Sequence, residues 1–321
     1  MKKVHFAAVG RDLYLDLPLS QTIMDYRQEG MIADLIAPVV NVSKQSGAII
    51  EFSQSDRWRI VDDRRAPGTE AKRFNIDVSS QLYYCNNYAL QMGVTIEDRA
   101  NADPVFVTKL IEGRAIMLKD KLDLNWDNRV SLKVTSATNV GSSASVSSIW
   151  SIPEGDGNPL LDLNTAIDNV RYATGYRPNR MIFGAKAWDA FRRHKNVRNL
   201  IFGTNNGGGY ANTAQVREIF EMDRVDVAGM FKNTAEENMA NSIGNIWGPS
   251  VLVYYAPLTP SIDRPSFMYS YRLSAPGIPN MQVERHPYNS KTKTDDIEVG
   301  YYQQELITGK RFGFLVQSCA A

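Results

Sequence analysis

The chain has little of the residue types on which many catalytic and metal sites depend. Its 321 residues include 2 cysteines and 3 histidines. Cys85 and Cys319 are far apart and form no motif, which fits a reducing compartment and offers no disulfide framework. His5, His194 and His286 lie in unrelated segments, and none has a cysteine or histidine at metal-ligand spacing. We expect His194, in FRRHKN, to lie on a solvated helix face.

The sequence also lacks the short motifs of common enzyme classes. It has no Gly-x-Ser-x-Gly elbow, so a Ser-His-Asp hydrolase has no anchor. Gly207, Gly208 and Gly209 are followed by Tyr210, whereas a phosphate-binding loop needs Gly-Lys-Ser/Thr. This stretch is therefore interpreted as a plain loop, and we expect no catalytic residues, no metal and no cofactor.

Charge and hydropathy exclude further classes. Lys and Arg number 36 against 35 Asp and Glu, so a net charge of +1 gives no bulk field for nucleic acid or an anionic membrane. No apolar run approaches the roughly 20 residues that span a bilayer. The N-terminal MKKVHFAAVGRDLYLDL is interrupted at Arg11-Asp12, too early for a secretory signal. The 43% hydrophobic content is that of a globular protein, and the length suggests about two domains.

What the sequence does contain is a long predicted β-hairpin from Lys44 to Tyr84. Its limbs are KQSGAIIEFSQSDRWRIVD and EAKRFNIDVSSQLYY, and its charged tip, DDRRAPGTE, contains the Pro67-Gly68 turn. Because a lone hairpin is marginal in water, it needs a partner surface, for which we expect a second copy of the chain. The candidate intersubunit contacts are its charged residues Arg57, Arg59, Asp62, Asp63, Arg64, Arg65, Glu70, Lys72 and Arg73.

Two kinds of partner were weighed for this hairpin. Trp58 and Phe74 lie beside the basic residues, an arrangement that allows a nucleic-acid patch. Acidic residues such as Asp56 and Asp77 interleave with the basic ones, however, and mixed signs favour a protein of complementary charge. For any single charged residue of the hairpin, exposure to solvent without a partner is as good an interpretation as an intersubunit contact.

A long helix is predicted after the hairpin. Asp103 followed by Pro104 is a strong helix start, because an acid caps the helix and proline fits its first position. Apolar residues follow at helical spacing, and we expect the helix to end at about Trp126. A short helix is expected at residues 19–28, and the Gly/Ser-rich residues 136–148 are expected to form a linker or surface loop.

Helices and strands then alternate from Leu160 to Pro257, which predicts an α/β layer domain. LDLNTAIDNVRYATG is an amphipathic helix that ends at Gly175, RPNRMIFG is a strand, and AKAWDAFRRHKNVRNLI is one further helix. AQVREIFEM is a third helix, and RVDVAGMF and WGPSVLVYYAP are strands. The tail, residues 266–321, returns to strands, which we expect to join a sheet beneath the long helix.

This order of parts resembles the major capsid proteins of tailed double-stranded DNA bacteriophages, whose α+β fold is called the Hong Kong 97 fold. RRAPGTE is similar to the tip of their extended loop (E-loop), and DLNTAIDNVRYATGYRPNRMIFGAKAWDAFRRHKNVRNLI is similar to the helix-strand-helix of their axial domain. The resemblance covers nearly the whole chain. It implies an N-terminal arm at 1–42, an extended β-hairpin at 43–84, a peripheral domain at 85–151 and 266–321 with a long spine helix at 103–126, and an α/β axial domain at 152–265.

The resemblance implies a structural, non-enzymatic role in a virion. Copies would form the hexamers and pentamers of an icosahedral shell, assembled in the host cytoplasm and enclosing DNA without sequence-specific binding or a membrane. Because the arm is short, we expect a separate scaffolding protein; a portal is a further expected partner, and a decoration or cement protein is a candidate. In this interpretation Gly207, Gly208, Gly209 and Tyr210 form a loop at the capsomer axis.

Three alternatives remain open on the sequence alone. An encapsulin-type nanocompartment resembles the same fold but encloses enzymes. A soluble α/β enzyme could use some of the 15 tyrosines for ligand stacking, and titratable groups that converge in one cleft would favour it. Another virion component, such as a tail or decoration protein, would be expected to lack the long helix and the α/β domain.

Overall fold

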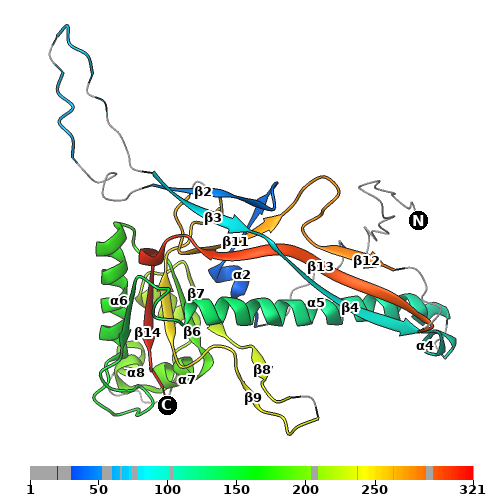
Figure 1. Ribbon diagram of the computed structural model, residues 1–321. Coiled ribbons are helices and arrows are strands. Elements are labelled where there is room, and N and C mark those ends of the chain that lie inside the picture. Colours follow the sequence, from blue (N-terminus) through cyan, green and yellow to red (C-terminus); the bar gives the residue numbers. More distant parts are fainter. Residues whose placement is uncertain are drawn as a thin grey trace.

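Two five-stranded sheets and one long helix organise the chain (Figure 1). The computed structural model describes residues 20, 30–52, 60–65, 67–71, 73, 78–101, 104–203, 209–236, 238–262, 264–286 and 292–320. The helix expected at residues 19–28 lies outside this set except for Ser20.

The first sheet is built around its longest strand, β13 (Thr294–Ile307). One edge of β13 pairs with β4 (Asn86–Thr95), and the other pairs with β11 (Met268–Leu273) and β12 (Gln282–Arg285), all antiparallel. β1 (Val39–Val42) then adds to β11 in parallel. The sheet therefore joins three stretches that are far apart in the sequence, and a short helix, α4 (Ile96–Ala100), follows β4.

The long helix α5 (Pro104–Val134) packs against both sheets. Its predicted start at Pro104 is confirmed, but the predicted end at about Trp126 is wrong, because the helix continues to Val134. With a rise of 1.5 Å per residue it is about 46 Å long. Its first half packs on the first sheet and its second half packs under the second sheet, through the buried residues Ile111, Ala115, Leu118, Leu122, Trp126, Val130 and Val134.

The second sheet has helices on one face and α5 on the other. Its strands, in order, are β5 (Ser142–Ser145), β14 (Gly313–Gln317), β10 (Val251–Tyr254), β6 (Arg180–Gly184) and β7 (Arg224–Ala228). Covering one face are α6 (Pro159–Thr174), α7 (Ala185–Arg193), α8 (Lys195–Phe202) and α9 (Thr213–Ile219).

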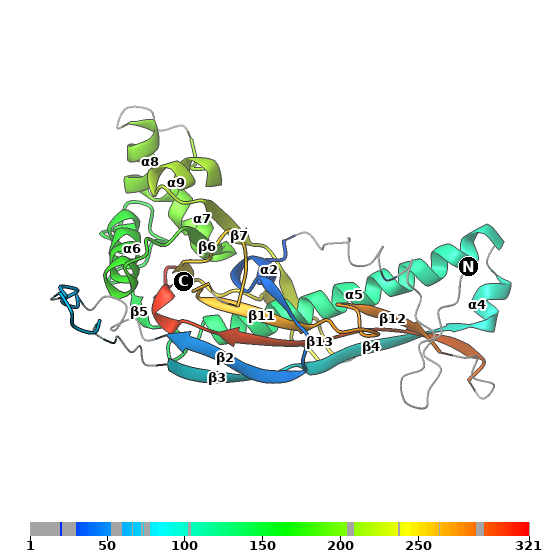
Figure 2. The same ribbon diagram turned by 90° about the horizontal axis from the view of Figure 1, so that it is seen from above.

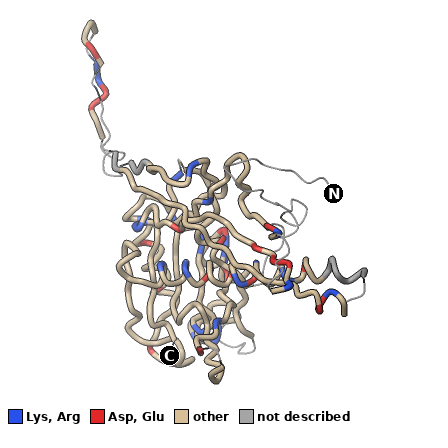
Figure 3. Tube along the Cα trace, turned by 45° about the vertical axis from the view of Figure 1, so that its right-hand side comes forward, with Lys and Arg blue, Asp and Glu red and all other residues tan. Residues whose placement is uncertain are grey.

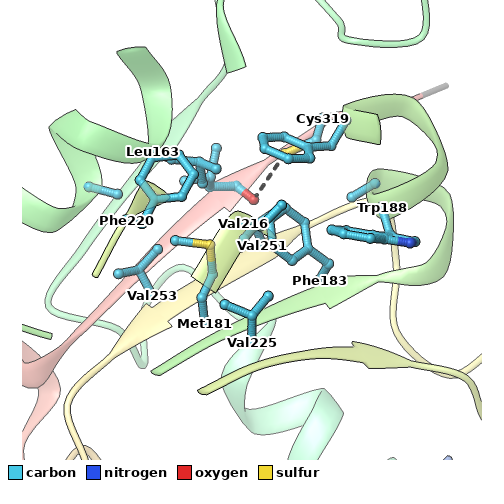
Figure 4. Packing of buried hydrophobic residues seen from close by; sticks show 14 of the residues in the cluster. Leu163, Met181, Phe183, Trp188, Val216, Phe220, Val225, Val251, Val253 and Cys319 are labelled. Atoms are coloured by element: carbon cyan, nitrogen blue, oxygen red, sulfur yellow. Dashed lines mark hydrogen bonds between the residues drawn. The ribbon is translucent and has the colours of Figure 1, made fainter. Parts of the chain in front are cut away.

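Side-chain alternation in the strands of the second sheet explains these two cores. Met181 and Phe183 point into the core under α6 to α9, together with Trp188 of α7 (Figure 4). Ile182, between them, points to the opposite core, which contains Trp126 of α5. The period of two places buried residues on both faces, so this sheet is the middle layer of the α/β region.

The tail of the chain divides between the two sheets. β11, β12 and β13 join the first sheet, as expected. The same expectation is wrong for β14, which pairs with β10 and β5 in the second sheet. A 3-10 helix, Lys310–Phe312, links β13 to β14. The domain division at residues 152 and 265 stays a prediction.

Two other local predictions are wrong. Residues 136–148 are not only a loop, because Ser142–Ser145 form β5, whose backbone pairs in parallel with β14. The run AKAWDAFRRHKNVRNLI is two helices, α7 and α8, which separate at His194. In both cases the backbone is held by partners distant in sequence, which local composition does not reveal.

Two antiparallel pairs and a short helix complete the described fold. β2 (Ser46–Phe52) pairs with β3 (Val78–Tyr84), which confirms the base of the predicted hairpin. β8 (Phe231–Asn233) pairs with β9 (Ile243–Asn245). α2 (Ala33–Ile36) belongs to the core between α5 and the second sheet.

Candidate intersubunit surfaces

The base of the β2–β3 hairpin is fixed to the first sheet. Tyr83 stacks on the buried Tyr271 of β11 with ring centroids 5.4 Å apart. The backbone amide of Tyr84 donates to the side-chain oxygen of Gln304 in β13. Cys85, directly after β3, is fully buried and free, and its Sγ lies 3.5 Å from the carbonyl oxygen of Tyr271. The hairpin therefore leaves the body from a firm base.

The other face of the hairpin exposes apolar side chains. Leu82 and Tyr84 are 76% and 55% exposed, whereas Ile49 on the opposite face is buried. The register pairs Leu82 with Ala48 and Ile49 with Gln81, so the two faces alternate along each strand. Sequence reasoning missed this outer apolar face, although the alternation in SQLYY contained the signal.

The hairpin tip is a charged loop far from the body of the molecule, and both basic and acidic residues lie along it (Figure 3). The Asp62 carboxylate accepts a hydrogen bond from the Arg64 amide at 3.2 Å, and the Arg65 guanidinium donates to the carbonyl oxygen of Thr69. Gly68 has a φ of +80°, which glycine adopts at no steric cost and which supports the predicted turn. Ile60, beside the charged residues, is 99% exposed.

The predicted contact residues thus fall into two groups. Six are described and exposed: Asp62, Asp63, Arg64, Arg65, Glu70 and Arg73. Three lie outside the described residues: Arg57, Arg59 and Lys72. The described group lies in one projecting segment, so it can act together on one partner surface.

The helices that flank the predicted axis loop, α8 and α9, lie at the end of the α/β region farthest from β2 and β3 (Figure 2). Gly207 and Gly208 are outside the described residues, while Gly209 and Tyr210 are described. A Cβ on Gly209 would lie 2.5 Å from the ring of Phe202, so any other residue here would require that ring to move. Tyr210 is 60% exposed.

A further apolar stripe lies on the outer face of α6. Leu161 and Tyr172 are 61% and 81% exposed. They are eleven residues apart, close to three helical turns, and Thr165 and Asp168 lie between them on the same face. The predicted amphipathic helix placed its buried side correctly, but this exposed pair was not recognised as a candidate contact.

A buried polar layer joins α5 to the first sheet. The Glu305 carboxylate of β13 accepts from Arg129 at 3.1 Å and from Gln303 at 3.0 Å, and Lys133 lies 3.5 Å from its other oxygen. Gln303 in turn accepts from Arg272, whose burial lowers its pKa. Burial alone would raise the pKa of Glu305, but the cations Arg129 and Lys133 outweigh it and lower that pKa.

Asp127 of α5 fixes the segment before the hairpin. Its carboxylate accepts from the amides of Ile32 and Ala33, at 3.2 and 2.8 Å, at the start of α2. Its other oxygen accepts from the Trp247 indole at 3.0 Å. Burial raises the pKa of Asp127, and these donors act in the opposite direction. Asp127 is fully buried, although no local feature of the residues around it indicates this.

His194 is not on a solvated helix face, so that prediction is wrong. The side chain is fully buried, and its Nδ1 accepts from the amide of Asn196 at the start of α8. Burial lowers its pKa, which favours the neutral ring. The residue therefore caps a helix and ends the preceding one.

A small cavity near α4 is the feature nearest to an active site. Its volume is about 200 Å³, and its charged lining includes Arg99, Arg285, His286, Asp295 and Asp296. Arg99 forms an ion pair with Asp295, and His286 lies 2.8 Å from Glu298. None of the lining residues is Ser, Cys, Lys or Tyr, and the carboxylates and the imidazole are the groups of this lining that could act as nucleophiles.

Metal-binding and membrane-spanning features are absent from the described residues. In the described part of the chain, no group of three or more His, Cys, Asp or Glu side chains is placed to hold a metal ion. No described helix combines the length and apolar character needed to cross a membrane.

The sequence is similar to phage major capsid proteins. Residues 150–240, which contain α6 to α9, match the family described as Phage major capsid protein E. The major capsid protein of Burkholderia phage BcepMu is 22% identical over 283 residues, which cover 84% of this chain and 87% of the relative.

Solved structures share the fold over nearly the whole chain. A phage-related protein from Bordetella bronchiseptica RB50 has a TM-score of 0.76 at 21% identity, covering 96% of this chain and 98% of that one. The capsid protein of cyanophage P-SCSP1u has a TM-score of 0.59 at 12% identity, covering 91% and 88%. An encapsulin from Synechococcus elongatus PCC 7942 reaches 0.51 at 12% identity, covering 91% and 88%.

The predicted resemblance is therefore confirmed: the chain is similar in sequence to phage major capsid proteins and has their Hong Kong 97-like α+β fold.

Proposed function

We propose that the chain is the major capsid subunit of a tailed phage. Copies form hexamers and pentamers of an icosahedral shell that encloses double-stranded DNA, and the subunit resides in the virion after assembly in the host cytoplasm. The fold, the family match over residues 150–240 and the Burkholderia phage relative support this function. The role is structural and uses no cofactor.

The observation that carries the assembly step is the β2–β3 hairpin. Its base is built into the first sheet, whereas its tip carries exposed charges and an Ile60 side chain that is 99% exposed. When a partner covers an isoleucine that is fully exposed to water, the burial stabilises the complex by about 1.5–3 kcal/mol. The hairpin lies over the adjacent subunit of the same capsomer, and many such weak contacts sum through multivalency.

Further contacts come from the loop at Tyr210 and from the N-terminal arm. Tyr210 and its neighbours face the capsomer axis, and the arm ties adjacent subunits together. A separate scaffolding protein and a portal assist assembly, with a decoration protein as a further candidate. Near-neutral net charge suits a shell whose DNA is neutralised by counterions.

Two alternatives are less well supported. An encapsulin shares the fold, but the family match and the sequence relative both belong to phage capsid proteins. A soluble enzyme would need a site, and the acid Asp295 in the one charged cavity described above is already paired with Arg99.

The test is assembly of the purified chain, alone and with a co-expressed scaffold, followed by size-exclusion chromatography and negative-stain electron microscopy. Wild type gives shells, capsomer rings or polyheads. The double variant Arg64→Glu/Arg65→Glu gives at least about tenfold fewer particles, because two charges of the tip are reversed. Arg64→Lys/Arg65→Lys, which keeps the charge, is the matched control.

Circular dichroism separates assembly from folding in this experiment. Both variants keep the wild-type spectrum, since the substituted side chains are exposed. A wild-type particle yield from Arg64→Glu/Arg65→Glu contradicts the role of the tip. A wild type that stays monomeric or dimeric even with a scaffold contradicts the capsid function itself.

A further inference from the structure

The α7–α8 helix pair concentrates positive charge in a chain that is nearly neutral. Between Ala185 and Phe202 there are 5 basic residues and 1 acidic residue, while the whole chain has a net charge of +1. Asp189, the acid, pairs with Arg192 at 2.8 Å. The basic residues are Lys186, Arg192, Arg193, Lys195 and Arg198.

Three of these cations are exposed: Lys186, Arg193 and Lys195. None of the three forms an ion pair with another described residue. Like charges that gather without partners raise the energy of the isolated surface and attract an anion. Asp189, the acid of this helix pair, is engaged by Arg192 and so does not neutralise these three cations.

An aromatic ring completes the surface. The guanidinium carbons of Arg192 and Arg198 lie 5.7 and 5.9 Å from the centroid of the Tyr210 ring. Tyr210 is itself 60% exposed, whereas Arg192 and Arg198 are half-buried beside its ring. Arginines around an exposed aromatic ring are characteristic of surfaces that bind phosphate-bearing polymers.

His194 brings the cations together. This residue lies between Arg193 and Lys195 in the sequence, and its side chain is buried. It caps the start of α8 by accepting a hydrogen bond from the Asn196 amide at 3.3 Å. The last turn of α7 and the first turn of α8 therefore meet at one corner, and each contributes basic residues to it. Burial lowers the pKa of His194, which favours the neutral ring and so limits any repulsion between it and these cations.

We propose that this basic surface, formed by Arg192 and Arg198 beside Tyr210 and by Arg193 and Lys195 at the junction of α7 and α8, binds the phosphate groups of a polyanion. The source is either a nucleic-acid backbone or a small polyphosphate, because both present the same oxygens. If the surface lies near the capsomer axis, several copies bring their cations together and a bound polyanion offsets the repulsion. Only this last step rests on the proposed function.

The test measures binding by the purified, unassembled chain to a short DNA duplex of random sequence and to inorganic tripolyphosphate. We expect the wild type to bind, with affinity falling steeply between about 50 and 200 mM salt. Arg193→Glu/Lys195→Glu weakens binding at least about tenfold and flattens the salt dependence by about two phosphate contacts. Arg193→Gln/Lys195→Gln gives a smaller loss and guards against misfolding.

The matched control is Lys121→Glu/Arg171→Glu, which changes net charge by the same amount at exposed positions on α5 and α6. It keeps wild-type affinity within about twofold, because it leaves the proposed contacts in place. Equal losses in the two Glu variants would mean that only net charge matters, and would overturn the proposal. So would a wild type that binds neither probe at low salt.

The two probes distinguish the source of the phosphate. Binding of tripolyphosphate that displaces DNA supports one phosphate site open to both. Binding of DNA alone, lost in Arg193→Glu/Lys195→Glu, supports a nucleic-acid backbone. Particle formation is measured separately by electron microscopy. Shells that form without polyanion binding contradict this proposal but leave the proposed function intact. Polyanion binding without shells contradicts only the proposed function.

Discussion

The tip of the β2–β3 hairpin and the polar layer under α5 contain the same kinds of charged side chain in opposite surroundings. At the tip, Arg64, Arg65 and Asp63 are exposed. In the layer, Glu305 is 2% exposed and is held between Arg129 and Lys133. Exposed charges contribute little to the stability of a single chain, whereas a buried charge without its partner is costly. The layer therefore serves the fold, and the tip is free to serve assembly.

The largest effect on the fold is expected from Glu305→Ala. Removing this carboxylate takes away the charged partner of the half-buried Arg129 and the acceptor of the buried Gln303 amide. Breaking a buried pair in this way costs about 3–5 kcal/mol. Urea unfolding followed by circular dichroism measures the loss.

The control for that experiment is Glu70→Ala at the exposed tip. Its free energy of unfolding should stay within about 0.5 kcal/mol of wild type. Similar losses for Glu70→Ala and Glu305→Ala would abolish the contrast between the two regions.

An intermediate, pH-dependent effect is expected from His194→Asn. Asparagine can still cap α8 but leaves a void, so we expect a loss of about 1–2 kcal/mol at neutral pH. Burial lowers the pKa of His194 below its ordinary 6.5, so its neutral form is favoured in the folded chain. Its contribution is therefore complete above pH 6.5 and declines as pH falls toward the folded pKa.

The readout is the difference in unfolding free energy between wild type and His194→Asn from pH 7.5 to 5. That difference should shrink as the pH falls, because protonation of His194 favours the unfolded wild type, whereas the asparagine of the variant does not titrate. A difference that stays constant across this range would show that the buried ring does not titrate with folding.

The smallest effect on the fold, combined with a clear effect on assembly, is expected from Leu82→Ser. The side chain is 76% exposed on the outer face of β3, so unfolding should change by less than about 0.5 kcal/mol. Particle yield should fall if this apolar face contacts a neighbouring subunit, and sedimentation of the assembly reaction measures it. Ser80→Ala on the same face is the control, and full yield from Leu82→Ser would restrict the contact to the charged tip.

The sequence predicted elements whose determinants are local. The start of α5 follows from Pro104, the end of α6 from Gly175, and the hairpin from its limbs and the Pro67-Gly68 turn. Gly175 has a φ of +68°, the left-handed conformation that ends a helix at low cost.

Elements that depend on distant partners were missed. The predicted end of α5 at about Trp126 is too early, because Asp127 and Arg129 beyond it are satisfied by Trp247 and Glu305 from far along the chain. Likewise, His194 has charged neighbours in sequence but is buried between two helices. A local sequence pattern shows how polar a residue is, but not whether a residue from elsewhere in the chain will pair with it.

The contact surfaces were predicted in part for the same reason. The charged tip is exposed, which is compatible with either a solvated or a binding surface. That its residues contact a neighbouring subunit stays a prediction. Leu82, Tyr84 and Tyr172 were missed because an apolar side chain in a strand or helix is usually core. Only the structure shows that these three face outward.

The way α5 is shared between two cores has a consequence for cooperativity. Its first half is buried against the first sheet and its second half against the α/β region. If either layer melted, half of the helix would lose its packing, and a helical segment without packing is marginal in water. Neither layer can be lost without weakening the other, so the two unfold as one unit. A destabilising substitution in the core of the first sheet should therefore also lower the stability of the α/β region at the other end of α5.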